Sequence, residues 1–232
     1  MFQKTEGIIL KEKKIGEADK NLIIYTYHLG KINVLAKGVD RIYSKKGRHL
    51  QPFSICQLEL RKNKKWFYLR EVKIIKNFRK IKDNLAKTMV GYYFNELLDK
   101  SLHGEERNEE IFNLFKDSLE ILNDIKKDKI INLIYAFQIK LIKILGYLFS
   151  FQNENDLYKQ TKIYFTHQEF IILKFLEERE LFQSIRIKIK KSKNIEKLLS
   201  QLWEKILNEE VNSFKTIKKV KKFHQNHACF KG

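Results

Sequence analysis

Residues 16–53, with the sequence GEADKNLIIYTYHLGKINVLAKGVDRIYSKKGRHLQPF, decide the fold of this 232-residue chain. Two apolar runs rich in β-branched residues, 22–27 and 32–36, flank a turn-like segment that contains Gly30. Runs of this kind around a glycine-containing turn are typical of a β-hairpin. The segment that follows is rich in lysine and arginine and bounded by glycines, which suits a loop that contacts phosphate groups. The stretch therefore predicts a hairpin followed by a basic loop.

Three further runs with strand character surround the hairpin. They are TEGIILKEK (5–13), FSICQLEL (53–60) and WFYLREVKII (66–75), and the only proline of the chain, Pro52, lies just before the second of them. Five short strands separated by turns predict a small barrel. A basic barrel of five strands indicates an OB-fold, whose open face and loops bind oligonucleotides.

From about residue 81 the hydrophobic period changes. Apolar residues recur at spacings of three and four in 84–102, 108–125, 129–148, 167–180, 181–189 and 194–211, which predicts amphipathic helices. The third helix is apolar except for one stripe, made of Asn132, Ala136, Lys140 and Lys143. We expect this helix at the centre of a bundle, with only that stripe exposed.

The chain is therefore expected to be of the α+β class, with an all-β and an all-α domain. Residues 1–80 are expected to form the OB-fold, and residues 81–232 a helical bundle domain with a polar insertion at about 150–168 and a basic C-terminal tail. No linker rich in Gly, Ser or Pro separates the two parts, so we expect them to pack on each other.

Basic residues gather toward the two ends of the chain. The formal net charge is +19, and residues 1–80 hold 20 Lys and Arg against 7 Asp and Glu, whereas residues 81–211 hold 21 of each. A general drift of composition toward lysine would not leave the middle neutral. Because such clustering is typical of nucleic-acid-binding proteins, we interpret residues 1–80 as a module that faces a polyanion.

Two cysteines occur, Cys56 within a predicted strand and Cys229 near the end. They imply no disulfide framework, which fits a reducing cytoplasm. The N-terminal residues MFQKTEGIIL lack the long apolar region of a signal peptide. The most apolar run, 130–149, contains Lys140 and Lys143, and each would cost about 2.5–3.5 kcal/mol to insert into a bilayer. We therefore expect no transmembrane span.

Several short motifs occur in order along the chain. They are Gly16-Glu17-Ala18-Asp19-Lys20, Thr26, Gly30-Lys31, Ala36-Lys37-Gly38 and Leu50-Gln51-Pro52-Phe53, followed by Asn95-Glu96-Leu97-Leu98, Phe137, Leu141 and Leu145-Gly146-Tyr147. In this order and spacing the chain resembles the RecO family of bacterial recombination mediators, from about residue 5 to residue 147.

The resemblance implies a protein of DNA repair and recombination that is not an enzyme, binds single- and double-stranded DNA and anneals complementary strands. It implies RecR and the acidic C-terminal tail of the single-stranded-DNA-binding protein SSB as partners, and RecA loaded onto SSB-coated DNA as the outcome. A place at the bacterial nucleoid would follow.

Many RecO relatives carry a four-ligand zinc finger just after the Leu-Gly-Tyr element. Here residues 148–170 contain no cysteine, and His167 is their only histidine. Structural zinc is usually held by thiolate and imidazole groups, which one histidine cannot supply. We therefore expect a zinc-free member without a cofactor, in which the polar insertion is what remains of the finger.

The candidate DNA-binding residues centre on the basic loop. Cations would contact phosphates, and an aromatic ring among them would offer a base a stacking surface. The set comprises Lys37, Arg41, Tyr43, Lys45, Lys46 and Arg48 in the loop, with Lys20 and Lys31 beside the first hairpin as an extension of the track. The alternative interpretation is a solvated basic loop without a ligand.

The predicted barrel also carries six aromatic residues, which serve either as stacking platforms or as core. They are Tyr25, Tyr27, Phe53, Trp66, Phe67 and Tyr68. Strand alternation places Trp66 and Tyr68 on one face and Phe67 on the other, so one of these faces is core. For any single ring, a place in the core is the favoured interpretation.

Two weaker sites follow from the helical part and the tail. Lys140 and Lys143, bordered by Phe137 and Leu141, would attract an acidic tail with an apolar end such as that of SSB, although a solvated stripe fits equally well. The tail segment His224-x-x-His227-x-Cys229 has ligand-type residues but no fourth ligand. We expect no metal there.

No motif of catalysis is present. The sequence has no GxxxxGK[ST] loop, no HExxH and no GxSxG. Glu17 and Asp19 are interpreted as turn-capping or ion-pair residues, not as a metal site. Two alternatives stay open: an adaptor for RecR and SSB in which DNA binding is incidental, and an OB-fold protein that binds RNA.

Overall fold

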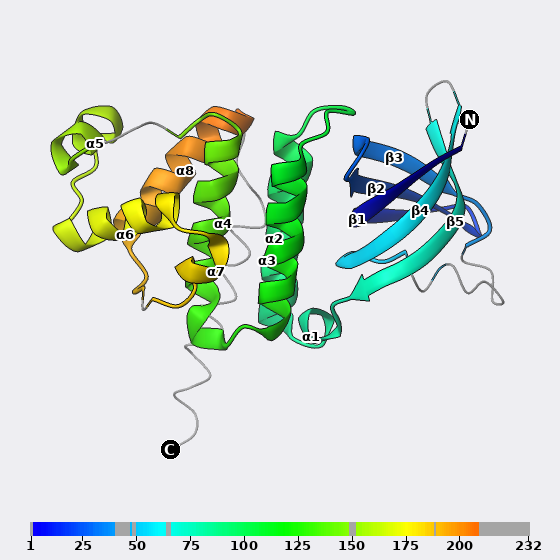
Figure 1. Ribbon diagram of the computed structural model, residues 1–232, viewed down its shortest axis with the longest axis horizontal. Helices are drawn as coiled ribbons and strands as arrows, with labels where there is room; N and C mark the ends of the chain where they lie inside the picture. The colour runs from blue at the N-terminus through cyan, green and yellow to red at the C-terminus, as the bar shows by residue number, and fades with distance from the viewer. Residues whose placement is uncertain are drawn as a thin grey trace, which may run out of the picture. The chain divides into compact units, whose positions relative to one another are not determined.

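A computed structural model of the chain describes residues 2–39, 47, 50–63, 66–148, 152–187 and 189–208. Its first part is a closed barrel of five strands, β1 (Phe2–Ile15), β2 (Asp19–Thr26), β3 (Gly30–Ala36), β4 (Ser54–Asn63) and β5 (Trp66–Asn77). The strands follow one another around the barrel in the order β1-β2-β3-β5-β4, as Figure 1 shows. Among these five described strands, β3 and β5 are the one pair that runs parallel. The predicted five-stranded OB-fold is confirmed.

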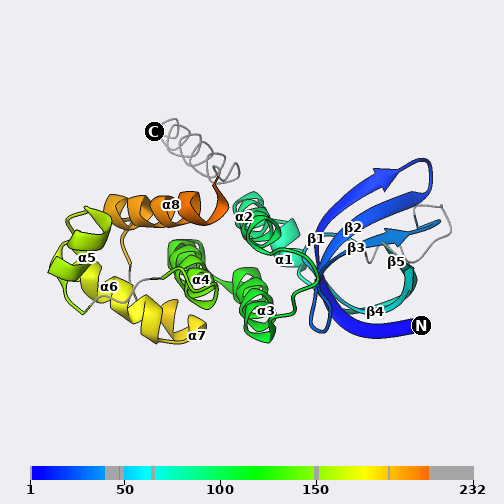
Figure 2. The ribbon, with the colours of Figure 1, turned by 90° about the horizontal axis from the view of Figure 1, so that it is seen from above.

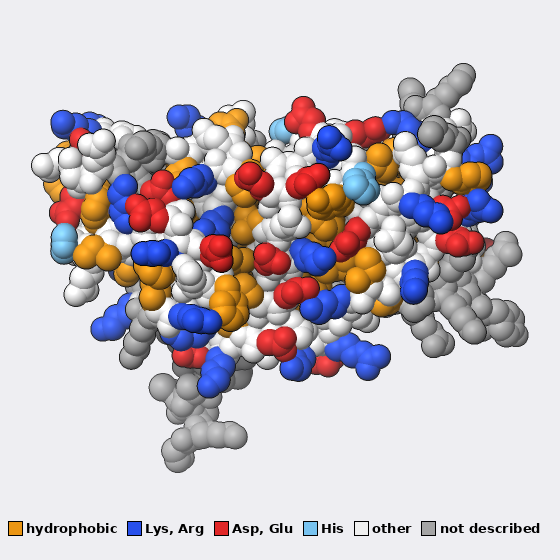
Figure 3. Space-filling model, viewed as in Figure 1, with side chains coloured by type: hydrophobic (Ala, Val, Ile, Leu, Met, Phe, Trp, Pro, Cys, Tyr) orange, Lys and Arg blue, Asp and Glu red, His pale blue; other side chains and the backbone are white. Residues whose placement is uncertain are grey.

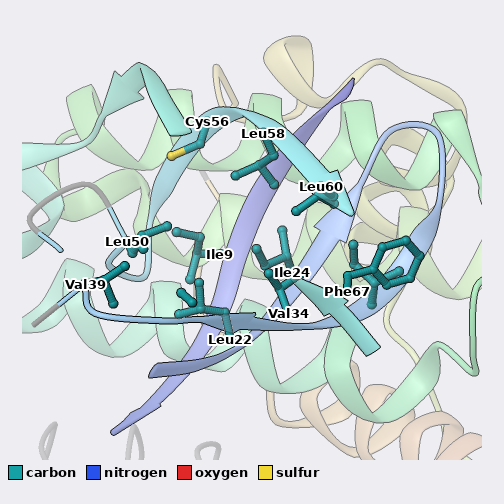
Figure 4. Close-up of a cluster of buried hydrophobic side chains, with 12 residues drawn as sticks. Ile9, Leu22, Ile24, Val34, Val39, Leu50, Cys56, Leu58, Leu60 and Phe67 are labelled. Carbon is teal, nitrogen blue, oxygen red and sulfur yellow. The ribbon is translucent and has the colours of Figure 1, made fainter. Parts of the chain in front are cut away.

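The barrel is filled by the side chains that alternate toward its axis. Figure 4 shows them converging from all five strands and from the loop between β3 and β4. The cluster includes Ile9, Leu22, Ile24, Val34, Val39, Leu50, Cys56, Leu58, Leu60 and Phe67. The β1–β2 and β4–β5 pairings shift register at irregularities, and such bulges let long strands bend far enough to close a barrel. Burial of this apolar surface is what stabilises the barrel.

Phe53 joins the barrel to the first long helix. It follows the lone proline, has a positive φ of 63° and is only 2% exposed. Its ring lies against Gly91 of α2 (Leu85–Ser101), where a Cβ atom would be 2.6 Å from the ring. The Tyr92 ring meets the Phe53 ring edge to face at 4.9 Å. Glycine at position 91 therefore lets α2 approach the end of the barrel.

Two helices pack on the barrel after the short α1 (Arg79–Lys82). The Asn95 side chain of α2 donates a hydrogen bond to the Leu10 carbonyl of β1 at 2.6 Å. At the start of α3 (Glu109–Asp124), Tyr25 donates to the Asn108 carbonyl and Tyr27 donates to the Glu109 carboxylate. Burial raises the pKa of Tyr25 to about 12, although its hydrogen bond to Asn108 lowers it, so the hydroxyl remains a donor at neutral pH.

The contacts divide the chain into two compact units, one that ends at Leu119 and one that begins at Glu120. The second unit contains the end of α3, a 3₁₀ turn (Lys127–Lys129) and helices α4 (Ile130–Ile144), α5 (Glu154–Thr161), α6 (His167–Glu178), α7 (Leu181–Ser184) and α8 (Lys193–Leu207). Figure 2 shows α4 with α6, α7 and α8 around it. Within the described ranges, no helix has the length and apolar character needed to cross a bilayer.

The polar stripe of α4 is less exposed than the sequence predicted. Asn132 and Ala136 are fully buried, and Asn132 donates hydrogen bonds to the carbonyls of Ile185 and Ile187 beyond α7. Lys140 donates to the Arg179 carbonyl at the end of α6. Carbonyls beyond a helix C-terminus have no partner inside the helix. The stripe therefore supplies those partners within the second unit and does not face solvent throughout.

The polar insertion contains a short helix that the sequence pattern did not predict. Asn153 caps α5 by accepting a hydrogen bond from the Asp156 N–H, and Leu157 anchors the helix in the core. Lys162 ends it in the left-handed conformation. With one buried leucine among polar residues, this segment has no recognisable hydrophobic period. Its start is instead marked by the capping residue Asn153. Conversely, α7 ends at Ser184, although the pattern predicted a helix to residue 189.

Glu169 joins the N-termini of α6 and α8. It accepts hydrogen bonds from Thr166 and from Asn194, the latter at 3.0 Å, and from the Ser192 hydroxyl. Partial burial raises the pKa of Glu169, but the bonds from Ser192, Asn194 and Thr166 together lower it below its ordinary value. A carboxylate between two helix N-termini also interacts favourably with both helix dipoles.

The Gly91→Ala variant is expected to be less stable than the parent by about 1–2 kcal/mol. Overpacking against Phe53 destabilises by about 1–3 kcal/mol, and the higher helix propensity of alanine offsets up to about 1 kcal/mol of this. Urea unfolding measures the loss. In a Phe53→Leu background the loss should shrink, since the ring is gone. An equal loss in both backgrounds would show that the close approach of these two residues does not matter.

The Glu169→Gln variant is expected to be less stable than the parent at pH 7, because the lowered pKa means that folding favours the carboxylate. This stabilisation is present above the ordinary pKa of 4.5 and is lost as the pH falls through the lowered folded value. The difference in stability that urea unfolding shows at pH 7 should therefore shrink at pH 3. Glu178→Gln, at an exposed position on the same helix, is the control. A difference that is equally large at pH 3 contradicts this role.

Candidate nucleic-acid interface

The motif residues of the barrel build its turns. Thr26 accepts a hydrogen bond from the Leu29 N–H and donates one to the Gly30 carbonyl, which closes the turn between β2 and β3. Gly30 has φ +66°, and a Cβ there would lie 2.4 Å from the Glu106 carbonyl oxygen. Asp19 accepts a hydrogen bond from the Gly38 N–H at 2.7 Å. The interpretation of Asp19 as a turn-capping residue agrees with this geometry, and the carboxylate ties down the start of the basic loop.

Two of the predicted DNA-binding lysines are engaged inside the protein. Lys31 pairs with the Asp99 carboxylate of α2 at 3.3 Å and also donates to the Asp99 carbonyl. Lys11 approaches the same carboxylate at 2.5 Å. Lys20 pairs with Glu12 across the β1–β2 hairpin at 2.8 Å. Lys20 and Lys31 each have a carboxylate partner within the protein. Lys20 lies opposite Ala36, the residue before Lys37, whereas Lys31 lies at the other end of β3.

Lys37 is the predicted DNA-binding residue that the structure places at the surface. It is exposed, and its ammonium lies 5.7 Å from the centroid of the Tyr68 ring. The remaining loop predictions lie outside the described residues: Arg41, Tyr43, Lys45, Lys46 and Arg48. The tail residues His224, His227 and Cys229 lie outside them as well. Their roles stay predictions.

The six aromatic residues of the barrel separate into three groups. Phe53 and Phe67 are buried. Tyr25 and Tyr27 contact Phe112 of α3, at ring separations of 6.1 and 5.4 Å. Trp66 is 44% exposed and Tyr68 is half-buried on the outside of β5.

Strand alternation predicted the opposite faces of Phe67 and its two neighbours. It did not show which face was outside, because that depends on how the sheet closes.

Arg61 is a surface cation that the candidate set missed. It lies opposite Tyr68 in the β4–β5 pairing, is exposed and has no ion-pair partner among the described residues. Its neighbours on the same two strands are paired, Lys62 with Glu105 and Arg70 with Glu59. Arg61 begins the basic run RKNKK (61–65), but the sequence did not show that it lies opposite Tyr68, which is information that only the cross-strand register supplies.

The four residues of α4 that we expected to contact an acidic tail differ from that expectation in their burial and in their partners. Phe137 and Leu141 are fully buried. Lys140 and Lys143 both approach carbonyls near the end of α6, those of Arg179 and Glu177, and Lys143 also lies 3.7 Å from the Glu177 carboxylate. The apolar surface that the hypothesis needs is therefore inside the second unit. No surface at these four residues combines accessible charge with an accessible apolar pocket.

The described residues offer little for catalysis or metal binding. Burial raises the pKa of the Cys56 thiol to about 12, so it is not a thiolate nucleophile. No group of three or more His, Cys, Asp or Glu side chains in the described part could hold a metal ion. In the region of the relatives' zinc finger, His167 instead pairs with Glu154 at 2.7 Å. These residues do not fit a structural zinc site.

The fold and this surface define a class: an OB-fold barrel with a basic outer wall, followed by helices. Comparison with known families then assigns the chain. Residues 1–78 match the description "Recombination protein O N terminal" and residues 82–173 match "Recombination protein O C terminal". The chain belongs to the RecO family, as the motifs of its sequence predicted.

Curated relatives carry the name DNA repair protein RecO. The protein of Thermoanaerobacter sp. (strain X514) is 30% identical over 145 residues, which cover 62% of this chain and 58% of the relative. That of Clostridium perfringens (strain 13 / Type A) is 37% identical over 149 residues, covering 63% and 59%. That of Caldicellulosiruptor bescii is 31% identical over 148 residues, covering 64% and 60%. The chain thus matches less than two thirds of these relatives' length.

Removing the Asp19 carboxylate should release the start of the basic loop. In the Asp19→Ala variant, we expect amide hydrogen exchange at Gly38 to be faster by about tenfold or more, because one hydrogen bond is worth about 1 kcal/mol and this one has a charged acceptor. NMR measures the exchange rate. Asp19→Asn keeps an acceptor oxygen and should exchange more slowly than Asp19→Ala. An unchanged rate in the alanine variant would exclude the anchoring role.

Proposed function

We propose that this chain is a non-enzymatic recombination mediator of DNA repair that binds single- and double-stranded DNA and anneals complementary strands. The observation that carries the proposal is the outer wall of the barrel. There Lys37 and Arg61 are exposed without an ion-pair partner among the described residues, and both lie beside Tyr68. The excess of 20 basic over 7 acidic residues in residues 1–80 supplies the long-range attraction.

Charge neutralisation is the mechanism of annealing in this proposal. Two complementary strands repel each other through their phosphates, and this repulsion limits how often their bases meet. A basic surface that holds both strands releases their counterions and screens the repulsion. The basic loop, from Lys37 through Arg41, Lys45, Lys46 and Arg48, belongs to this surface in the proposal. No covalent step, nucleotide or metal is required.

Membership of the RecO family supports the further parts of the proposal. RecR and the acidic tail of SSB are the proposed partners, and the loading of RecA onto SSB-coated DNA is the proposed outcome. We place no SSB contact at Phe137 or Leu141, since both side chains are buried. We also propose that the chain works without zinc, because the insertion has no cysteine. The bacterial cytoplasm, at the nucleoid, is its proposed place of action.

Single-strand binding should depend steeply on salt. With about six phosphate contacts, the affinity for a fluorescent oligonucleotide should fall by about two to three orders of magnitude between 50 and 200 mM salt. The double variant Lys45→Glu/Lys46→Glu should bind at least about tenfold more weakly at 100 mM salt. Fluorescence anisotropy measures both effects.

Lys126→Glu/Lys127→Glu is the matched control for that variant. It changes the net charge equally, at two adjacent exposed lysines of the second unit. Salt-insensitive affinity, or equal losses in the two double variants, would contradict a specific basic surface on the barrel. An annealing assay with labelled complementary strands, without ATP or metal, then distinguishes a mediator from an adaptor. Faster annealing supports the mediator, whereas DNA binding without faster annealing favours the adaptor.

A further inference from the structure

One band of side chains winds around the outside of the barrel, from one end of β1 to near its other end. Each member lies opposite the next in the strand register, and the band comprises Lys13, Asn21, Leu35, Tyr68, Arg61 and Phe2. None of these residues is buried, whereas the residues next to them along the strands, such as Leu22, Val34 and Phe67, fill the core. Side chains directly opposite on neighbouring strands have Cβ atoms about 4.5–5.5 Å apart. This outer band is therefore a continuous strip.

The charge of the outer band is positive. Lys13 and Arg61 are exposed and have no ion-pair partner among the described residues, and Lys37 extends from the end of β3 over Tyr68. No acidic residue belongs to the band. By contrast, Lys11 and Lys31, on the side of the barrel that α2 covers, share Asp99. Figure 3 shows acidic and basic side chains intermingled over the helices.

Aromatic rings lie among these cations. Trp66 is two residues before Tyr68, so strand alternation puts both rings on the outer face of β5. The Phe2 ring is 52% exposed, and the Arg70 guanidinium lies 4.4 Å from its centroid. An isolated exposed ring needs no explanation, but two neighbouring rings beside unpaired cations form the combination that binds bases and phosphates together.

We propose that single-stranded DNA lies along the outer band, with bases stacked on Trp66 and Tyr68 and phosphates on Lys37 and Arg61. This inference rests on the proposed DNA-binding function and adds the surface and the strandedness. A base can lie flat on a ring only when it is out of the duplex stack, so the rings select single strands. The phosphate contacts alone would serve a duplex equally well. A strand held in this way has its bases unstacked from one another, and the repulsion between its phosphates and those of a complementary strand is screened.

Tryptophan fluorescence tests the proposal directly, because the chain has only two tryptophans. Trp203 is 3% exposed and donates a hydrogen bond to Gln138, so it should not respond to DNA. In a Trp203→Phe variant, Trp66 is the only emitter. We expect its emission to be quenched as oligo(dT) is added, with the same midpoint as fluorescence anisotropy of a labelled oligo(dT). Duplex DNA of equal length should bind with little quenching.

Substitutions give the second readout. Trp66→Ala and Tyr68→Ala should each weaken oligo(dT) binding about 5- to 100-fold, and Trp66→Phe should restore most of the affinity because it keeps a ring. Tyr164→Ala is the control, since that ring is 76% exposed on the second unit. Circular dichroism and the thermal midpoint establish that each variant is folded.

The outcomes separate this inference from the function on which it rests. Anisotropy could report DNA binding while the emission of Trp66 stays unchanged and Trp66→Ala binds as tightly as the parent. That result would overturn the outer band as the binding surface but leave the proposed DNA-binding function intact. Equal quenching by duplex DNA would overturn the selection of single strands. Tighter binding of oligo(rU) than of oligo(dT) would overturn DNA as the ligand. Absence of binding at low salt would overturn the proposed function itself.

Discussion

The carboxylate of Asp99 is the contact on which the arrangement of the first unit depends. It lies in α2 and meets two lysines of the barrel, Lys11 and Lys31, while Asn95 one turn earlier bonds to the backbone of β1. Helix and barrel are thereby held together by polar contacts beside an apolar interface. The same contact decides which cations can serve a ligand, because a lysine that neutralises a half-buried carboxylate is costly to withdraw. Asp99 offsets one of these two lysine charges, whereas Lys37 and Arg61 have no carboxylate partner among the described residues and keep their full charge available for DNA.

The motifs that identify the family have structural roles in the described residues. Asp19 and Gly38 join two of them by one hydrogen bond, Thr26 and Gly30 form a turn, and Phe53 packs on Gly91. These residues shape the barrel and attach α2 to it. Among the residues that we propose to bind DNA, Lys37 belongs to a quoted motif, whereas Arg61, Trp66 and Tyr68 lie outside them. The family motifs therefore locate only part of the proposed ligand surface.

Local patterns predicted the fold well and the site only partly. The five strands and the main helices follow from periods of two and of about 3.6, which each segment carries by itself. Lys31 is 68 residues from Asp99, and that pairing depends on how α2 docks. The same holds for Asn132 of α4, whose carbonyl partners lie more than fifty residues away. Charge and burial in the sequence therefore predicted where cations are, and only the tertiary contacts showed which are already paired.

The salt dependence of single-strand binding in two single variants tests this division of cations most directly. Each lost phosphate contact lowers the slope of log affinity against log salt by about 0.7 for single strands. Lys37→Gln should lower the slope by about that amount, whereas Lys31→Gln should leave it unchanged, since Lys31 already pairs with Asp99. A lower slope for Lys31→Gln together with an unchanged slope for Lys37→Gln would contradict the assignment of DNA to the outer wall of the barrel.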